Sequence, residues 1–152
     1  YRMGHDKVFD HMMLDGLEDA YEAGRSMGTL GEDCAANQLL YNLGSRGVEF
    51  DLLPWMQARD MPMMAYSPLG RGGLLEHPLI LDIANRHGAE PAQVALAAVL
   101  RHDGVIAIPK ASSVEHVQAN ADALEVQFDL EDLERLDRAF PPPTQETPLD
   151  II

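Results

Sequence analysis

Cysteine and long apolar runs are scarce in this sequence. Cys34 is the only cysteine among the 152 residues, so no disulfide can form within the chain, as is typical of proteins in a reducing compartment. No apolar run approaches the roughly 18 residues of a membrane-spanning helix. Residues 1–7 also lack the apolar core of a signal peptide. These absences predict a soluble, cytoplasmic protein without a membrane segment.

Positive charge is scarce as well. The chain has 11 Lys and Arg residues against 25 Asp and Glu residues, which gives a formal net charge of −14. So acidic a chain is repelled by nucleic-acid backbones and anionic lipids, which argues against both as partners. Hydrophobic residues make up 46% of the sequence, as in globular proteins, and the length suits one domain with a sizeable core.

Several sequence motifs of catalysis and metal binding are missing. The glycines of 70–73 lack the spacing of a dinucleotide or P-loop fingerprint, and neither G-x-S-x-G nor S-x-x-K is present. The histidines show none of the close spacings of a zinc site, so no metal site is predicted. They are His5, His11, His77, His87, His102 and His116.

The segment 104–120, GVIAIPKASSVEHVQAN, is the most informative part of the chain. The apolar run 105–108 predicts a strand buried on both faces, and Lys110 follows directly. Ser112 and Glu115 fit a capping box that begins a new helix. A lysine beside free helix N–H groups predicts an anion site, with phosphate as the expected ligand. A cap that serves stability alone is the alternative interpretation.

The rest of the chain predicts an α/β fold with a parallel sheet. Apolar residues recur at helical spacing over 9–23, and short apolar runs at 35–42 and 61–66 predict two further strands. Helical patterns follow each strand, at 50–59, 79–86, 91–100 and 130–140. This alternation is typical of parallel sheets, in which ligands bind at the carboxyl ends of the strands. Gln38, Tyr41, residues 66–70 and residues 110–113 are expected at that edge.

Four segments together resemble the aldo-keto reductase family: NQLLYN at 37–42, MAYSPLGRGGLL at 64–75, PAQVALAAVLR at 91–101 and VIAIPKASSVEHVQAN at 105–120. The resemblance implies a partial (β/α)₈ TIM barrel made of about three C-terminal strand–helix units, preceded by an N-terminal helix. The implied division is a helix and loop over residues 1–33 and a C-terminal half-barrel over residues 34–152. It also implies NADPH-dependent reduction of carbonyl compounds.

The resemblance further implies roles for individual residues in holding the cofactor. Tyr66 would stack on the nicotinamide ring, and Gln38 would hydrogen-bond its carboxamide. The remaining implied contacts follow the cofactor from pyrophosphate to adenine: Ser67, Leu69 and Gly70 along the pyrophosphate, Lys110 and Ser112 at the 2′-phosphate, and Asn120 at the adenine.

Three positions depart from the family pattern. His116 stands where the family often has Arg, which weakens the expected grip on the 2′-phosphate and makes NADH an alternative to NADPH. Ala119 stands where the family often has Glu, and Ala111 where it often has Ser. His116 is still counted among the expected cofactor-binding residues because of its position.

The catalytic Asp, Tyr, Lys and His of the family lie on its first four strands, before the matched region, so no catalytic residue is assigned here. Three functions follow as alternatives: the cofactor-binding half of an oxidoreductase, inactive alone; a non-catalytic nucleotide-binding or regulatory half-barrel; or a truncated product without activity. A small-molecule carbonyl substrate is expected only if the barrel is completed. Three parallel strands leave two open edges and an uncovered apolar face, which predicts self-association through the strands at 37–42 and 105–108. The alternative is that the helix expected over 9–23 covers one exposed side.

Overall fold

The computed structural model describes residues 35–70 and 73–150. By its internal contacts the chain divides into Tyr1–Ala35 and Ala36–Ile152, and almost all of the described residues belong to the second unit. The helix predicted over 9–23 lies outside the described residues. The described elements, in chain order, are β1 (Asn37–Leu40), η2 (Gly47–Glu49), α3 (Leu52–Gln57), β2 (Met63–Tyr66), α4 (Pro78–His87), α5 (Pro91–Leu100), β3 (Val105–Ala107), α6 (Val114–Asp122), η3 (Ala123–Glu125) and α7 (Leu130–Ala139).

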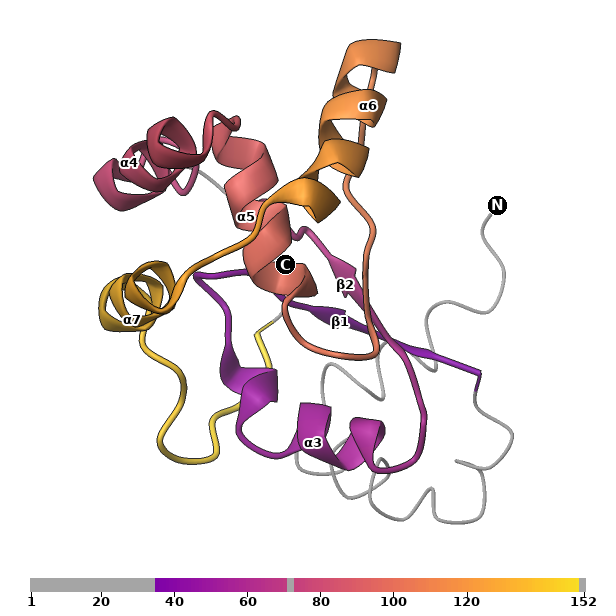
Figure 1. The fold of residues 1–152 in the computed structure, drawn as a ribbon. Coiled ribbons are helices and arrows are strands. Elements are labelled where there is room, and N and C mark those ends of the chain that lie inside the picture. The colour runs from indigo at the N-terminus through magenta and orange to yellow at the C-terminus, as the bar shows by residue number, and fades with distance from the viewer. Residues whose placement is uncertain (1–34, 71–72, 151–152) are drawn as a thin grey trace. The chain divides into compact units, whose positions relative to one another are not determined.

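The three described strands form one parallel sheet in the order β1-β2-β3. Figure 1 shows β1 and β2 side by side. Met63 is paired with Asn37 on one side and with Val105 on the other. Because the strands are parallel and consecutive, their carboxyl ends lie at one edge of the sheet, and each connection between them carries helices. The predicted α/β fold with a parallel sheet is confirmed.

The two faces of the sheet differ in burial. Met63 and Ala65 are 0% exposed, whereas Met64 and Tyr66, which alternate with them, are only half-buried. In β3, Val105 is 9% exposed and Ile106 is 47% exposed. The prediction that this strand is buried on both faces is therefore wrong. Helices such as α5 pack on one side, and in the described part of the chain the other side of β3 stays open.

A core of apolar side chains joins α4, α5 and α7, which gather on one side of Figure 1. Its buried members are Leu43, Ile80, Ile83, Ala84, Val94, Ala98 and Leu136. The helix α5 is apolar on almost every side because it lies between these helices and β3. Within the described ranges, no helix is long and apolar enough to cross a membrane.

The helix α6 begins one residue later than the capping-box pattern predicts. Ser113, not Ser112, is the N-cap, and its hydroxyl oxygen accepts a hydrogen bond from the His116 N–H at 3.2 Å. Ser113 has the extended backbone that an N-cap requires (φ −138°, ψ 162°). Two adjacent serines before a helix leave the cap position ambiguous in the sequence.

Candidate functional site

Gln38 and Tyr66 lie on the same face of neighbouring strands. The register pairs Gln38 with Met64 and Leu40 with Tyr66, and alternate residues of a strand face the same side. Gln38 is exposed and Tyr66 is half-buried. Neither side chain has a hydrogen-bond partner among the described residues. An aromatic ring and a carboxamide are therefore both open to a ligand near the carboxyl edge of the sheet.

The turn from Ser67 to Gly70 follows β2 directly. The Gly70 N–H donates to the Ser67 carbonyl at 2.9 Å, which closes the turn. Ser67 and Gly70 both have left-handed backbones, with φ of 48° and 68°. The side chain of Asn42, in the loop after β1, also donates to the Ser67 carbonyl, at 3.1 Å. Leu69 belongs to this turn and is half-buried.

Lys110 lies just beyond β3, at the same edge of the sheet. The Ile108 N–H donates to the Ala65 carbonyl at 3.1 Å, so the pairing continues past Ala107, and Lys110 comes two residues after Ile108. Lys110 is exposed and has no ion pair with any residue that the structure describes. A lysine without an acidic partner is available to an anionic ligand.

The remaining predicted residues lie on or before α6. Ser112 directly precedes the N-cap and is exposed. His116 and Asn120 are four residues apart on α6, which puts them on one face of the helix. His116 is exposed and Asn120 is half-buried. Of the nine residues predicted to hold a cofactor, Gln38 lies within β1, and Tyr66 ends β2. The other seven lie in the turn after β2, in the loop after β3, or on α6.

Tyr41 is not available to a ligand at this edge, contrary to the expectation from the sequence. Its side chain is 2% exposed, and its hydroxyl donates to Glu49 Oε1 at 2.7 Å. Burial, together with the hydrogen bond and the charge of Glu49, raises the pKa of Tyr41 far above its ordinary value. The hydroxyl is therefore neutral and fixed.

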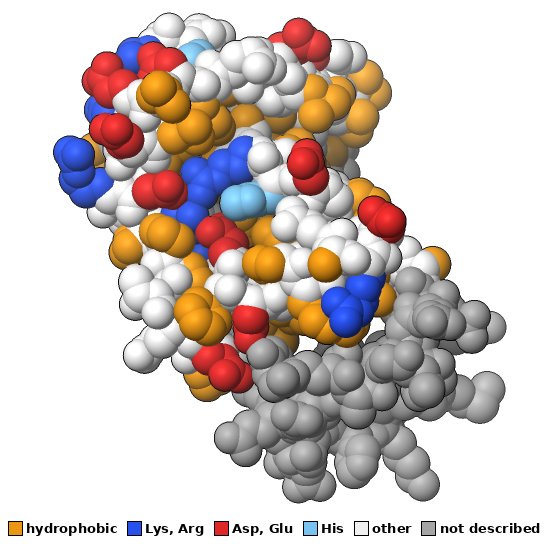
Figure 2. All heavy atoms as spheres, turned by 60° about the horizontal axis from the view of Figure 1, so that its bottom comes forward, with side chains coloured by type: hydrophobic (Ala, Val, Ile, Leu, Met, Phe, Trp, Pro, Cys, Tyr) orange, Lys and Arg blue, Asp and Glu red, His pale blue; other side chains and the backbone are white. Residues whose placement is uncertain are grey.

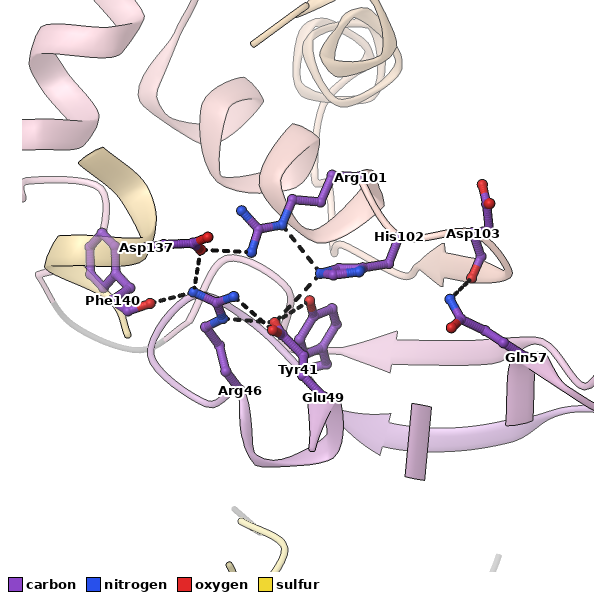
Figure 3. A network of polar contacts seen from close by, with 9 residues as sticks. All are labelled: Tyr41, Arg46, Glu49, Gln57, Arg101, His102, Asp103, Asp137 and Phe140. Carbon is purple, nitrogen blue, oxygen red and sulfur yellow. Dashed lines mark hydrogen bonds and ion pairs between the residues drawn. The ribbon is translucent and has the colours of Figure 1, made fainter. Parts of the chain in front are cut away.

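Tyr41 belongs to a polar network that the sequence did not reveal (Figure 3). Arg46, whose side chain is 5% exposed, is at its centre. It binds Glu49 with two hydrogen bonds of 2.7 Å, Asp137 with one of 2.8 Å, and the Phe140 carbonyl. Arg101 also binds Asp137, at 3.0 Å. The network joins the loop after β1 to the ends of α5 and α7.

The network pairs positive side chains with negative ones. Burial by itself would raise the pKa of Glu49, but the surrounding side chains of His102, Arg46 and Tyr41 hold that pKa far below 4.5. Burial also raises the pKa of Asp137, but Arg101 and Arg46 lower it by more, so the pKa lies below its ordinary value. Figure 2 shows Lys or Arg and His side chains gathered near the middle of one face, with Asp and Glu side chains beside them. Because Arg46 and Arg101 bind the carboxylates of Glu49 and Asp137, we assign the network of Figure 3 a structural role.

No group of three or more His, Cys, Asp and Glu in the described ranges is placed to hold a metal ion. The buried carboxylate of Asp132 is bound by Arg86 and His87, each at 2.7 Å. That contact joins the end of α4 to the start of α7, and Asp132 is fully buried there.

The fold and this edge define a class of protein: a parallel α/β unit whose polar residues collect at the carboxyl ends of its strands. The sequence model of the aldo/keto reductase family matches residues 17–140, and the chain belongs to that family. The three strands that the structure describes, with their helices, correspond to part of the family's (β/α)₈ barrel, as predicted.

Known relatives match the chain over most of its length. Methylglyoxal reductase YeaE of Escherichia coli is 51% identical over 127 residues, which cover 80% of this chain and 45% of the relative. Glyoxal reductase of Bacillus subtilis is 32% identical over 87 residues, which cover 57% of this chain and 31% of the relative.

A solved structure is similarly close. An aldo-keto reductase from Klebsiella pneumoniae in complex with NADPH is 52% identical, with a TM-score of 0.77, and the match covers 80% of this chain and 44% of that one. The chain therefore spans less than half the length of these relatives.

Proposed function

We propose that this chain forms the cofactor-binding half of an NADPH-dependent carbonyl reductase. The observation that carries the proposal is the open placement of Gln38 and Tyr66 on one face, next to the turn that begins at Ser67. The Klebsiella pneumoniae relative, which is 52% identical, was solved with NADPH. NADH is the alternative cofactor, because His116 stands where the family often has Arg.

The chemistry of the edge fits the parts of this cofactor. The Tyr66 ring offers a flat apolar surface for the nicotinamide, and the Gln38 amide can both donate to and accept from its carboxamide. Ser67, Leu69 and Gly70 would lie along the pyrophosphate. Lys110 supplies a positive charge that has no ion pair among the described residues.

The adenosine end of the cofactor would meet α6. Ser112 and His116 would bind near the 2′-phosphate, where the N-terminus of the helix also favours negative charge. Asn120, on the same face of α6 as His116, would bind the adenine. When bound, NADPH supplies a hydride for the reduction of a carbonyl group.

Catalysis needs groups beyond those assigned in this chain. A reductase of this kind needs a proton donor beside the substrate carbonyl, and no such residue is assigned here. We therefore expect the chain alone to bind the cofactor without turnover, and a small carbonyl substrate to bind only when a complementary half completes the barrel. The alternative function is a non-catalytic nucleotide-binding or regulatory half-barrel, which requires no proton donor.

We also propose that the chain associates with itself and functions in the cytoplasm. In the described sheet β1 and β3 are edge strands, and edges with unpaired N–H and C=O groups favour pairing with another strand. The cytoplasm is proposed because Cys34 is the sole cysteine.

A titration with NADPH tests the proposed function. Binding is measured by quenching of Trp55 fluorescence. Tyr66→Ala is expected to weaken binding about tenfold, because it removes a stacking surface, whereas Tyr66→Phe keeps the ring and most of the affinity. Equal affinities of wild type and Tyr66→Ala would contradict the assigned role. Oxidation of NADPH that depends on an added aldehyde would show that the chain is an active enzyme, and its absence would favour the non-catalytic alternative.

A further inference from the structure

Asn42 is a buried polar residue in the loop after β1, and both ends of its side-chain amide are used. It is 5% exposed. Its Oδ1 accepts from the Gly44 N–H at 2.9 Å, and its Nδ2 donates to the Ser67 carbonyl at 3.1 Å. The bond from Gly44 fixes which way the amide points, so that the Nδ2 donor faces the turn after β2.

The Ser67 carbonyl is therefore held from two directions. It accepts from the Gly70 N–H within the turn and from the Asn42 side chain outside it. Ser67 has φ of 48°, a left-handed backbone that residues other than glycine rarely adopt. Such a conformation persists only when surrounding contacts hold it in place. The hydrogen bond from Asn42 is one of these contacts.

Asn42 also packs beside the other end of the turn. A Cβ at Gly70 would lie 3.7 Å from Asn42 Cγ and 3.0 Å from Leu74 Cδ2, so the turn passes close to both side chains. A hollow of about 360 Å³, lined by Asn42, Gly44 and Gly70 among others, borders the turn.

The loop that carries Asn42 is itself anchored. The Asn42 and Ser45 backbones exchange hydrogen bonds of 3.0 and 3.4 Å, and Arg46 follows in the buried network of Figure 3. The Asn42 amide is thus held on a fixed support, as a positioning group must be.

We infer that Asn42 is a positioning residue: its amide holds Ser67 in the left-handed conformation and so preforms the turn 67–70 for the pyrophosphate of the cofactor. This inference rests on the proposed function in its last step, because the turn is assigned to the cofactor only there. The step from Asn42 to the shape of the turn stands on the geometry alone.

The first test is NADPH affinity in matched variants. Asn42→Asp keeps the acceptor for Gly44 and loses the donor for Ser67, and Asn42→Ala loses both. Each is expected to weaken binding about tenfold. Asn85→Asp, an exposed position on α4, makes the same change of charge and is expected to leave affinity unchanged. Thermal unfolding of each variant shows whether it is folded at the assay temperature.

The second test separates positioning from general stability. In a Ser67→Gly background the left-handed backbone carries no steric cost, so Asn42→Ala is expected to weaken binding less than threefold there. The same loss in both backgrounds would overturn the inference. So would wild-type affinity in both Asn42 variants.

The third test needs no cofactor. The Gly70 N–H bonds to the Ser67 carbonyl, so its hydrogen exchange reports the turn directly. Exchange at Gly70 is expected to be at least tenfold faster in Asn42→Asp and Asn42→Ala, with no change at Gly88 at the end of α4. Unchanged exchange at Gly70 would overturn the inference. If the wild type binds no NADPH but Gly70 responds in this way, the proposed function fails and the positioning by Asn42 stands.

Discussion

At the scale of single residues, Arg46 joins segments that are far apart in the chain. Its guanidinium binds Glu49 three residues away, Asp137 on α7 and the Phe140 carbonyl. A buried ion pair is expensive to break, because the charge that remains has lost its water as well as its partner. We therefore regard this network as a support for the loop after β1, and hence for the edge where the cofactor is proposed to bind.

The network gives the stability of the protein a defined pH dependence. The pKa of Glu49 is lower in the folded chain than its ordinary value of 4.5, so its carboxylate stabilises the fold above that pH, and this contribution is lost as the pH falls below it. Glu49→Gln is expected to lower the free energy of unfolding at pH 7 by about 3 kcal/mol and to flatten its decline between about pH 5 and 3. Urea unfolding at a series of pH values measures both effects.

Glu134→Gln provides the control for that experiment. Glu134 is exposed on α7, so its variant is expected to keep the wild-type stability and pH dependence. Asp137, whose pKa is also lowered, accounts for the slope expected to remain in Glu49→Gln. An identical pH dependence in Glu49→Gln and the wild type would show that Glu49 does not contribute to acid stability.

Some single residues of the site could be predicted from the sequence, and others could not. Tyr66 could be placed at the edge because it ends an apolar run, and Lys110 because it follows one. Arg46 could not, because it lies in a short loop and its partner Asp137 is 91 residues further along the chain. No local pattern marks such a contact. The left-handed backbone of Ser67 could not be predicted either, because glycine is the residue type that indicates such a backbone in a sequence.

At the scale of elements, the sequence predicted types better than boundaries. The strand expected over 35–42 is β1, which spans Asn37–Leu40, and the helix expected over 50–59 is α3, which spans Leu52–Gln57. Apolar periodicity identifies such elements because burial decides them, but their ends depend on caps and on neighbours. The contact between α4 and α7 is an example of such a neighbour: Asp132 on α7 is bound by Arg86 and His87 at the end of α4.

The start of α6 offers a prediction at this scale. Ser113→Ala removes the oxygen that accepts from the His116 N–H and is expected to lower the free energy of unfolding by about 1 kcal/mol. Ser112→Ala is the matched control, since Ser112 has no such bond within the described chain, and it is expected to change stability by less than about 0.5 kcal/mol. Chemical denaturation compares the two variants. A larger effect at Ser112 would restore the cap position that the sequence alone suggested.

At the scale of the whole molecule, the described sheet corresponds to part of a barrel, and β3 is open on one side among the described residues. The relatives are more than twice as long as the matched region, which covers 45% of one and 44% of another. In a closed (β/α)₈ barrel every strand has two neighbours and the inner face is filled by side chains. In the described sheet β1 and β3 each pair with β2 alone, and Ile106 on β3 is 47% exposed.

These open features give the last prediction, which concerns association. We expect the chain to form dimers or larger species at micromolar concentration in sedimentation velocity, with Ile106 at the contact. Ile106→Lys is expected to raise the dissociation constant at least tenfold, because burial of an isoleucine contributes about 1.5–3 kcal/mol and a lysine there adds a charge to an edge strand. Leu81→Lys is the matched control: Leu81 is 42% exposed on α4, away from the sheet, and its replacement is expected to leave association unchanged. A wild type that stays monomeric at high concentration and melts cooperatively would contradict the prediction, and an equal effect of the two lysines would show that the contact lies elsewhere than on β3.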